Sequence, residues 1–355
     1  MPCAGLRPRR AAMLRGMGFC LSHISALEYW RSLDAFDSSL LLAGGASSRT
    51  AVPHPSAGGV ISCREIADEV LAGAGPLSEP VHILVPSKDC RRTTDVLVFH
   101  VRANPVPRNS LYALSKGGFV ASLELTFVQC AASESLFDLM RIGAELTGSY
   151  GIVVDRSQYE DAFCGFVKRE RLSSVAKMQA FLARVPGDRG LRKARRALRY
   201  IPENCASPME AALALLLHLP RSLGGYGLPK PHMNYRIDMR RGDWKASGKP
   251  YYVCDLYWPD AGLCVEYDST MFHTQRERIA SDSKRRNALA FRGVSVVSVT
   301  AKQMFDRGEL DKVAFLLAKM LGVRLSLSAP EFRSRQQALR TALLFEGDVG
   351  VRNRR

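Results

Sequence analysis

The segment from 254 to 268, CDLYWPDAGLCVEYD, predicts a β-hairpin that carries one acidic residue inside each strand. Two short apolar stretches flank a Pro-Asp-Ala-Gly turn, which is the pattern expected of two antiparallel strands. Asp255 lies in the first strand and Glu266 in the second, although acidic residues are depleted from strands. A fold that contains this hairpin must therefore either expose both carboxylates to water or hold them beside a positive charge.

The turn also predicts which residues face each other. If it is centred on Asp260 and Ala261, Trp258 faces Leu263 and, stepping outward, Asp255 faces Glu266. Because side chains alternate between the faces of a strand, one face is expected to be apolar, with Cys254, Leu256, Trp258, Leu263, Val265 and Tyr267. The other face then holds Asp255, Glu266 and Asp268, and like charges on opposed positions destabilise a sheet.

This acidic face has two interpretations. It is either an exposed acidic edge or a site for a divalent cation such as Mg²⁺, which prefers oxygen ligands and binds one or two carboxylates. Such a cation removes the repulsion, polarises a phosphate oxygen and lowers the pKa of bound water. His273 follows Asp268 at the expected junction with a helix, where it is either a general base or a structural residue.

The elements expected around the hairpin follow the order helix, strand, strand, strand, helix, strand. The first helix starts after Ser207, with Glu210 placed as in a capping box. A strand near 234–239 precedes the hairpin, and the second helix has a capping box of Thr274 and Glu277 and ends at Gly293. A buried strand at 294–299 and two amphipathic helices near 308–321 and 329–345 complete the pattern.

These residues and their order resemble the PD-(D/E)xK, restriction-endonuclease-like superfamily, in the Vsr-like branch that includes the domain of unknown function 559. The segment VCDLYWPDAGLCVEYD, a following His and DSKRRNALAFRGVSVVSVT are similar to the pattern D…VEYDG…H…D-x-x-R-x-x-x-L-x-x-x-G. Asp282, Arg285, Leu289 and Gly293 match it in register, and the resemblance covers about residues 205–303.

The resemblance implies a site for Mg²⁺ or Mn²⁺ with Asp255 and Glu266 as ligands, completed by the backbone carbonyl of Tyr267. Glu210 would supply an additional acid near the metal, although a capping box explains this residue equally well. Asp268 stands where the superfamily has a lysine, and Ser269 where the branch has a glycine. Lys284 on the next helix is a candidate for the missing positive charge, and His273 or Lys284 would handle protons.

The charge of the chain points to a polyanionic partner or to a generic solubilising surplus. Lys and Arg total 50 against 34 Asp and Glu, so the net charge is +16. The segment 189–199, RGLRKARRALR, holds basic residues and no acid, and it is either a solvated helix face or a phosphate-binding stripe. The residues expected to hold the DNA backbone are Arg192, Lys193, Arg195, Arg196, Arg285 and Arg286.

The N-terminal half carries weaker signals. Strands are expected at 81–86 and 95–102 and helices within 122–146. The segment VASLELTFVQCA is similar, at Ser122 and Thr126, to AbiEi-type antitoxin and regulator proteins, or it is an ordinary helix start. The nine cysteines include no CxxC pair and no apolar segment reaches membrane-spanning length, which favours a cytoplasmic protein with reduced thiols and no membrane association.

The sequence therefore predicts an α/β protein with an α+β N-terminal part. Its expected divisions are a segment 1–60, an accessory or regulatory domain 61–203, a restriction-endonuclease-like domain 204–303 and C-terminal helices with a basic tail at 304–355. The predicted function is a Mg²⁺-dependent DNA endonuclease, associated through the family with defence or mobile elements. The alternative is a catalytically inactive nuclease fold that binds DNA, with an N-terminal half that contacts a protein partner.

Overall fold

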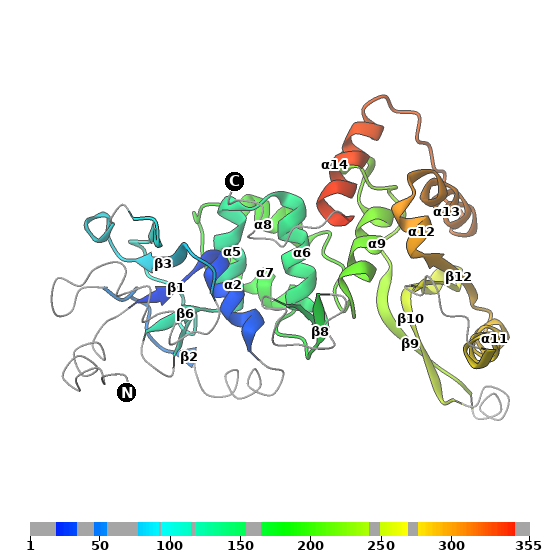
Figure 1. The fold of residues 1–355 in the computed structure, drawn as a ribbon, viewed down its shortest axis with the longest axis horizontal. Coiled ribbons are helices and arrows are strands. Elements are labelled where there is room, and N and C mark those ends of the chain that lie inside the picture. The colour runs from blue at the N-terminus through cyan, green and yellow to red at the C-terminus, as the bar shows by residue number, and fades with distance from the viewer. Residues whose placement is uncertain are drawn as a thin grey trace, which may run out of the picture. The chain divides into compact units, whose positions relative to one another are not determined.

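The computed structural model describes residues 19–33, 46–54, 77–91, 94–114, 118–153, 165–240, 249–268 and 276–344, with side chains omitted at 276–282. His273, Ser269 and Thr274 therefore lie outside the described residues, as do the side chains of Glu277 and Asp282. Helices and strands alternate along the chain, which confirms the mixed α and β fold class (Figure 1). None of the described helices combines the length and apolarity needed to cross a membrane.

The chain divides into two compact units. The first comprises Met1–Leu139 and Gly151–Arg196, and the second Met140–Tyr150 and Ala197–Arg355. The C-terminal helices after 304 therefore belong to the same unit as the hairpin at 254–268.

The first unit is built on a six-stranded mixed sheet of order β2-β5-β6-β1-β3-β4. Its strands are β1 (Cys20–Leu21), β2 (Ala46–Ser47), β3 (Val81–Val85), β4 (Leu97–Val101), β5 (Leu111–Ala113) and β6 (Phe119–Ala121). The described helices between 19 and 198 are α2 (His23–Ser32), η1 (Lys88–Cys90), α5 (Leu123–Ser133), α6 (Leu136–Thr147), α7 (Val175–Ala183) and α8 (Leu191–Leu198). Most of α6 belongs to the second unit, which includes Met140–Tyr150. A separate ribbon pairs β7 (Tyr150–Ile152) with β8 (Phe166–Lys168). The strands and helices expected at 81–86, 95–102 and 122–146 are confirmed by β3, β4, α5 and α6.

The start of α5 explains the two residues on which the AbiEi-type resemblance was based. The Ser122 hydroxyl accepts a hydrogen bond from the Leu125 amide at 3.2 Å, and the Thr126 hydroxyl donates to the Ala121 carbonyl at 3.3 Å. The Trp30 indole of α2 donates to the same carbonyl at 2.9 Å. Ser122 and Thr126 thus fix the start of α5 beside α2. This agrees with the interpretation of the segment as an ordinary helix start.

The second unit contains a four-stranded sheet of order β12-β11-β10-β9. Its strands are β9 (His232–Asp238), β10 (Tyr251–Trp258), β11 (Leu263–Asp268) and β12 (Ser295–Thr300). The helices are α9 (Pro208–His218), η3 (Arg221–Leu223), η4 (Pro259–Ala261), α11 (Arg276–Phe291), α12 (Ala301–Phe305), α13 (Arg307–Met320) and α14 (Phe332–Leu344). From α9 to β12 this is the predicted order of long helices and strands, whereas the short helix α12 was not predicted.

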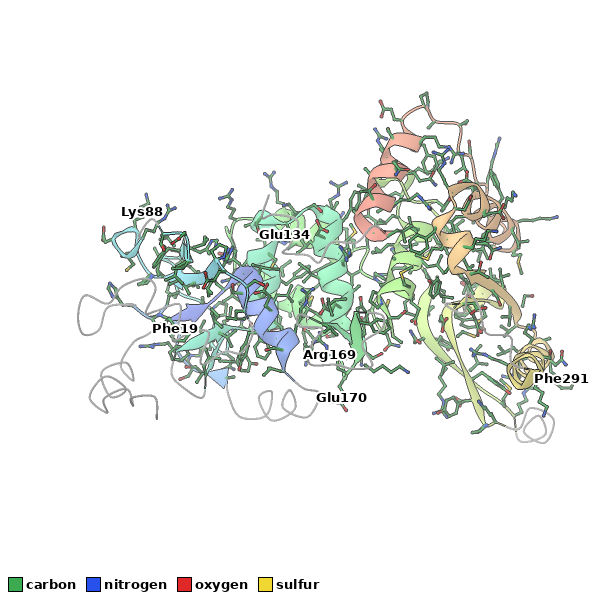
Figure 2. All side chains as sticks on the ribbon, viewed as in Figure 1. Phe19, Lys88, Glu134, Arg169, Glu170 and Phe291 are labelled. Carbon is green, nitrogen blue, oxygen red and sulfur yellow. The ribbon has the colours of Figure 1, made fainter. Side chains whose placement is uncertain are left out.

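Two helices enclose the sheet of the second unit. Figure 1 shows α9 on one side and α11 on the other, and α9 contacts the two hairpin strands. Helix α11 buries Ala288 and Leu289 against Cys254 and Cys264, while its last residue, Phe291, projects outward and is 80% exposed (Figure 2). The strand expected at 294–299 is confirmed as β12, but its burial is only partial, because Val294 and Val299 are buried whereas Ser295 and Ser298 are exposed.

The hairpin has the predicted register but not the predicted faces. Leu256 pairs with Val265 and Trp258 with Leu263, as the turn implied. However, Cys254 shares a core with Tyr257 and Cys264, although strict alternation places it on the opposite face. The break falls at Asp255, which faces Asn234 in the β9 register, and Asn234 has a left-handed backbone with φ 44°. Asn tolerates this conformation better than most residues, and the alternation of β10 breaks where Asn234 lies opposite it.

Gly262 closes the hairpin turn and gives a test of this packing. Its φ is 54°, and a Cβ atom there would lie 2.6 Å from the Gly293 carbonyl oxygen. We expect Gly262→Ala to lower the free energy of unfolding by about 3 kcal/mol, because left-handed strain and a backbone clash add. Gly322→Ala is the matched control, since Gly322 has φ 66° and nothing within 4 Å, and should lose about 1 kcal/mol. Urea unfolding measures both, and equal losses would contradict the close approach.

Candidate metal centre

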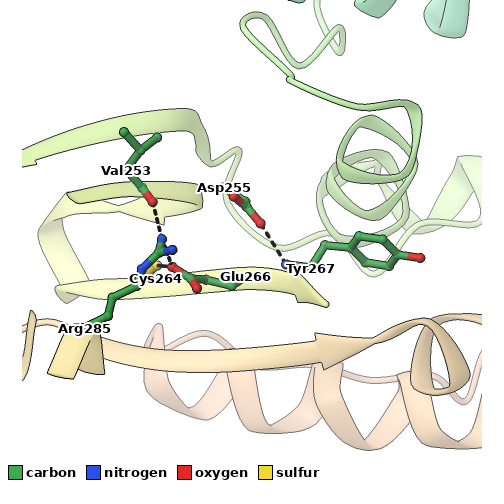
Figure 3. Close-up of polar contacts among 6 residues, drawn as sticks. All are labelled: Val253, Asp255, Cys264, Glu266, Tyr267 and Arg285. Atoms are coloured by element: carbon green, nitrogen blue, oxygen red, sulfur yellow. Dashed lines mark hydrogen bonds and ion pairs between the residues drawn. The ribbon is translucent and has the colours of Figure 1, made fainter. Parts of the chain in front are cut away.

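Asp255 lies inside β10 with its carboxylate directed toward the neighbouring strand. Its Oδ2 accepts a hydrogen bond from the Tyr267 amide at 2.9 Å (Figure 3). This carboxylate thus replaces the backbone carbonyl that a regular ladder would offer at that position, as expected where the strand twists. The other oxygen, Oδ1, has no partner among the described residues.

Glu266 is held by Arg285 of α11. The guanidinium donates to Glu266 Oε1 and to the Val253 carbonyl, so one side chain ties α11 to both hairpin strands (Figure 3). The Cys264 thiol also donates to Glu266 Oε1, at 3.6 Å. The side chains of Arg285 and Glu266 are 31% and 20% exposed, so this ion pair is largely shielded from water. Arg285 was expected to bind DNA phosphate, but in this structure it faces inward because a half-buried carboxylate and carbonyl need its donors.

Glu210 is the third carboxylate of the cluster and is only 9% exposed. Its Oε1 accepts from the Ser207 hydroxyl at 2.9 Å, and its Oε2 accepts from the Ala206 amide at 2.9 Å and from the Asn234 side chain at 2.7 Å. The Ser207 hydroxyl accepts in turn from the Glu210 amide. The N-cap at Ser207 is therefore confirmed, but Glu210 accepts from the Ala206 amide rather than from the Ser207 amide that a capping box uses. The bond to Asn234 adds a link to β9 that a capping box does not require.

The carboxylates interact strongly at Asp255. Burial raises the pKa of Asp255 to about 7, and the negative charges of Glu210 and Glu266 act in the same direction. The Tyr267 amide and the Arg285 guanidinium oppose this rise but do not cancel it. The cluster thus has more negative charge than its neighbouring cation neutralises, which is the electrostatic condition of a cation site.

The remaining site residues predicted from the sequence are less closely engaged. Asp268 is half-buried at the end of β11. Lys284 and Arg286 are exposed on α11, so the positive charge over the acids comes from Arg285 rather than from Lys284. On α8, Arg192, Arg195 and Arg196 are exposed, whereas the Lys193 ammonium donates to the Glu134 carbonyl at 2.6 Å.

Two cysteines lie beside the acids, which the sequence reasoning missed. Within the described residues, the ligand atoms of Cys254, Cys264 and Glu266 lie within 4.8 Å of one another. Strict alternation had separated the cysteines, but both lie in one core because the alternation in β10 breaks at Asp255, opposite Asn234. A hydrogen bond with the Cys254 thiol, followed by burial, raises the pKa of Cys264 far above its usual range. The thiol therefore stays protonated and is a poor metal ligand.

Oxygen ligands from the hairpin fit a hard divalent cation. Asp255 Oδ1 lacks a partner, Glu266 lies on the adjacent strand, and the Tyr267 backbone is in direct contact with Asp255. Carboxylate and carbonyl oxygens are the ligands that Mg²⁺ and Mn²⁺ prefer. Figure 3 shows the two carboxyl groups directed to different partners, so Glu266 would have to turn from Arg285 to share a cation with Asp255.

Comparisons with known proteins leave the family of this chain open. The chain is 26% identical over 147 residues to two uncharacterized proteins of Mycobacterium tuberculosis, MT2308 of strain CDC 1551 / Oshkosh and Rv2248 of strain ATCC 25618 / H37Rv. The match covers 41% of this chain and 48% of each relative, so the chain spans about half the length of the curated relatives it matches. No family model and no solved structure matches.

The raised pKa of Asp255 predicts a pH-dependent loss of stability without divalent cations. In the unfolded chain an aspartate ionises near pH ~3.9, whereas the folded carboxyl group keeps its proton to about 7. As pH rises between these values the folded state binds more protons, so its stability falls, by up to about 4 kcal/mol. Asp255→Asn should not show this fall, because the amide does not ionise.

Urea unfolding from pH 4.5 to 7.5 in EDTA measures this difference. Asp260→Asn is the matched control, because Asp260 is an exposed acid in the same hairpin, and it should follow the wild type. Parallel pH profiles for the wild type and Asp255→Asn would contradict the electrostatic account of the cluster.

Proposed function

We propose that the second unit is a Mg²⁺- or Mn²⁺-dependent nuclease that hydrolyses DNA phosphodiester bonds. The observation that carries the proposal is the cluster of Glu210, Asp255 and Glu266, in which burial, reinforced by the charges of the two glutamates, raises the pKa of Asp255 to about 7. Among the described groups that act on Asp255, the Tyr267 amide and the Arg285 guanidinium oppose this rise, and Arg285 is the one that carries a positive charge. Repulsion between buried carboxylates destabilises a hairpin, and a bound cation would remove it.

Each residue of the cluster has a role in this proposal. Asp255 Oδ1, a Glu266 oxygen and the Tyr267 carbonyl would hold the cation, and Glu210 would add negative charge from α9. When bound, the cation supplies Lewis acidity at a phosphate oxygen. Arg285 holds the Glu266 carboxylate at the hairpin. When Glu266 turns to the cation, the Arg285 guanidinium would be free to contact a phosphate. His273 or Lys284 would handle protons, and Lys284 is exposed as this role requires.

DNA would be held through its phosphates. One face of α8 is buried and is formed by Leu191, Ala194 and Leu198. The exposed side chains of the same helix include Arg192, Arg195 and Arg196. Lys193 instead anchors α8 at the end of α5. Exposed guanidinium groups without base-reading geometry favour sequence-independent contact with the DNA backbone.

A second candidate function is a non-catalytic nuclease fold that binds DNA and regulates, with the N-terminal half contacting a protein partner. The ion pair between Arg285 and Glu266 favours this reading, because it neutralises one of the two proposed strand ligands. Asp268 at the position of the usual lysine favours it as well. Both functions involve DNA binding, so metal-dependent cleavage must separate them.

The deciding experiment incubates plasmid and single-stranded DNA with the full chain and 10 mM Mg²⁺ or Mn²⁺, against EDTA. We expect cleavage by the wild type and by Asp260→Asn, and at least about a hundredfold slower cleavage by Asp255→Asn, since a ligand is lost. The same cations should raise the Tm of the wild type and of Asp260→Asn but not of Asp255→Asn. DNA binding without cleavage, together with equal cation responses of all three proteins, would establish the non-catalytic function.

The phosphate contacts predict a strong salt dependence. Each phosphate neutralised adds ~0.9 to the slope of log K against log salt, so four to six contacts weaken binding roughly 10²–10³-fold between ~50 and ~200 mM salt. The double variant Arg195→Ala, Arg196→Ala should lower that slope by about 2. Fluorescence anisotropy with a labelled duplex measures both slopes. An affinity that does not change with salt would exclude the electrostatic account.

A further inference from the structure

The first unit contains a cavity that the proposed nuclease function does not use. Its volume is about 590 Å³, and it lies between α2, β4, α5 and the loop that precedes α8. Small-molecule sites commonly measure ~300–1,000 Å³, so the cavity is large for a single inorganic ion and suits a small organic ligand. Leu84, Phe99 and Val128 give it an apolar wall.

A buried amide faces this cavity without a partner. Gln129 of α5 is 6% exposed, and its Oε1 accepts from the His23 backbone amide at 3.0 Å. Because a backbone N–H can only donate, this bond fixes which end of the amide is oxygen, and Nε2 must point the other way. Gln129 Nε2 is buried and has no hydrogen-bond partner among the described residues. An unmatched buried donor is costly unless a ligand accepts from it.

A second unmatched donor belongs to Arg102, at the end of β4. Its Nη1 binds Asp188 at 2.5 Å, with side chains 13% and 12% exposed, while its buried Nε has no partner in the described part of the chain. Arg91 and Arg189 also line the cavity and are exposed. Three arginines against one aspartate leave the cavity positively charged, and both unmatched groups require an acceptor.

The histidines of the cavity supply aromatic surface rather than charge. The rings of His23 and His100 stack with centroids 3.5 Å apart, and the His100 Nε2 and His82 Nδ1 atoms are 2.9 Å apart. Burial, and then the neighbouring imidazoles, lower the pKa of His23 well below its usual range and that of His100 to about 4. These rings are therefore neutral near pH 7. His23 has a left-handed backbone, φ 52°, a strained conformation of the kind that clusters at ligand sites.

We propose that this cavity binds a phosphomonoester of mononucleotide size. The phosphate would accept from Gln129 Nε2 and Arg102 Nε, with Arg91 and Arg189 adding positive charge. The ribose and base would lie along the apolar wall and the neutral imidazole rings, as aromatic bases stack on such surfaces. This proposal does not rest on the nuclease function, because every residue that carries it belongs to the first unit.

Isothermal titration calorimetry of the full chain with AMP tests the proposal, with ribose 5-phosphate, inorganic phosphate and adenosine as comparison probes at matched ionic strength. We expect saturable AMP binding with Kd below ~1 mM, and at least about tenfold weaker binding of both inorganic phosphate and adenosine. Absence of AMP binding overturns the proposal. If inorganic phosphate binds as tightly as AMP, the proposal of a mononucleotide-sized ligand is wrong. If adenosine binds as tightly as AMP, the proposed phosphate contacts are wrong.

Two variants test the contacts. Gln129→Glu keeps the oxygen that accepts from His23 but replaces the donor by an anionic oxygen, so AMP affinity should fall at least about tenfold. Arg189→Ala changes an exposed side chain and should weaken AMP several-fold without affecting the fold, which keeps the test valid if Gln129→Glu does not fold. Lys177→Ala removes an exposed cation outside the cavity and should bind AMP like the wild type. Unchanged affinity in both cavity variants would exclude this binding site.

Discussion

The side-chain amide of Asn234 organises the second unit. It donates to the Asn204 carbonyl at 3.0 Å and to Glu210 at 2.7 Å, while the Asn204 amide donates to the Met233 carbonyl at 3.0 Å. These bonds hold β9 against the segment that leads into α9 and fix the Glu210 carboxylate beside the hairpin. The left-handed backbone of Asn234 also sets the twist opposite Asp255. Asn234 thereby holds one carboxylate of the acidic cluster and lies opposite the position of a second.

Much of the second unit could be predicted from the sequence because its signals are local. The cap at Ser207 and the turn at Asp260 each arise within a few residues, and each is confirmed. The register followed from the turn for the same reason. The resemblance to the restriction-endonuclease-like superfamily stays a prediction, because neither the fold order nor the distant relatives test it.

The errors arose where a distant residue overrides a local rule. Alternation assigned Cys254 to the wrong face, because it breaks at Asp255, opposite the left-handed Asn234 of another strand. Burial of 294–299 was predicted from its composition, whereas in the outer strand β12 the burial is partial and the two serines are exposed. The sequence does not show which face of α11 packs inward, so Lys284 was chosen as the cation beside the acids. In the structure Arg285 is on the inward face and binds Glu266. The cavity of the first unit could not be predicted, because its walls come from segments about a hundred residues apart.

The raised pKa of the Cys264 thiol affects how the protein responds to oxidants and soft metals. All six cysteines in the described ranges are buried and unpaired, and two of them lie beside the acidic cluster. Oxidation and disulfide exchange proceed through the thiolate, and the raised pKa of Cys264 keeps that form scarce. A hairpin with two adjacent thiols would otherwise be sensitive to oxidants and to soft metals such as Cu(I). Here the same burial that raises the pKa of Asp255 keeps the neighbouring sulfur redox-inert.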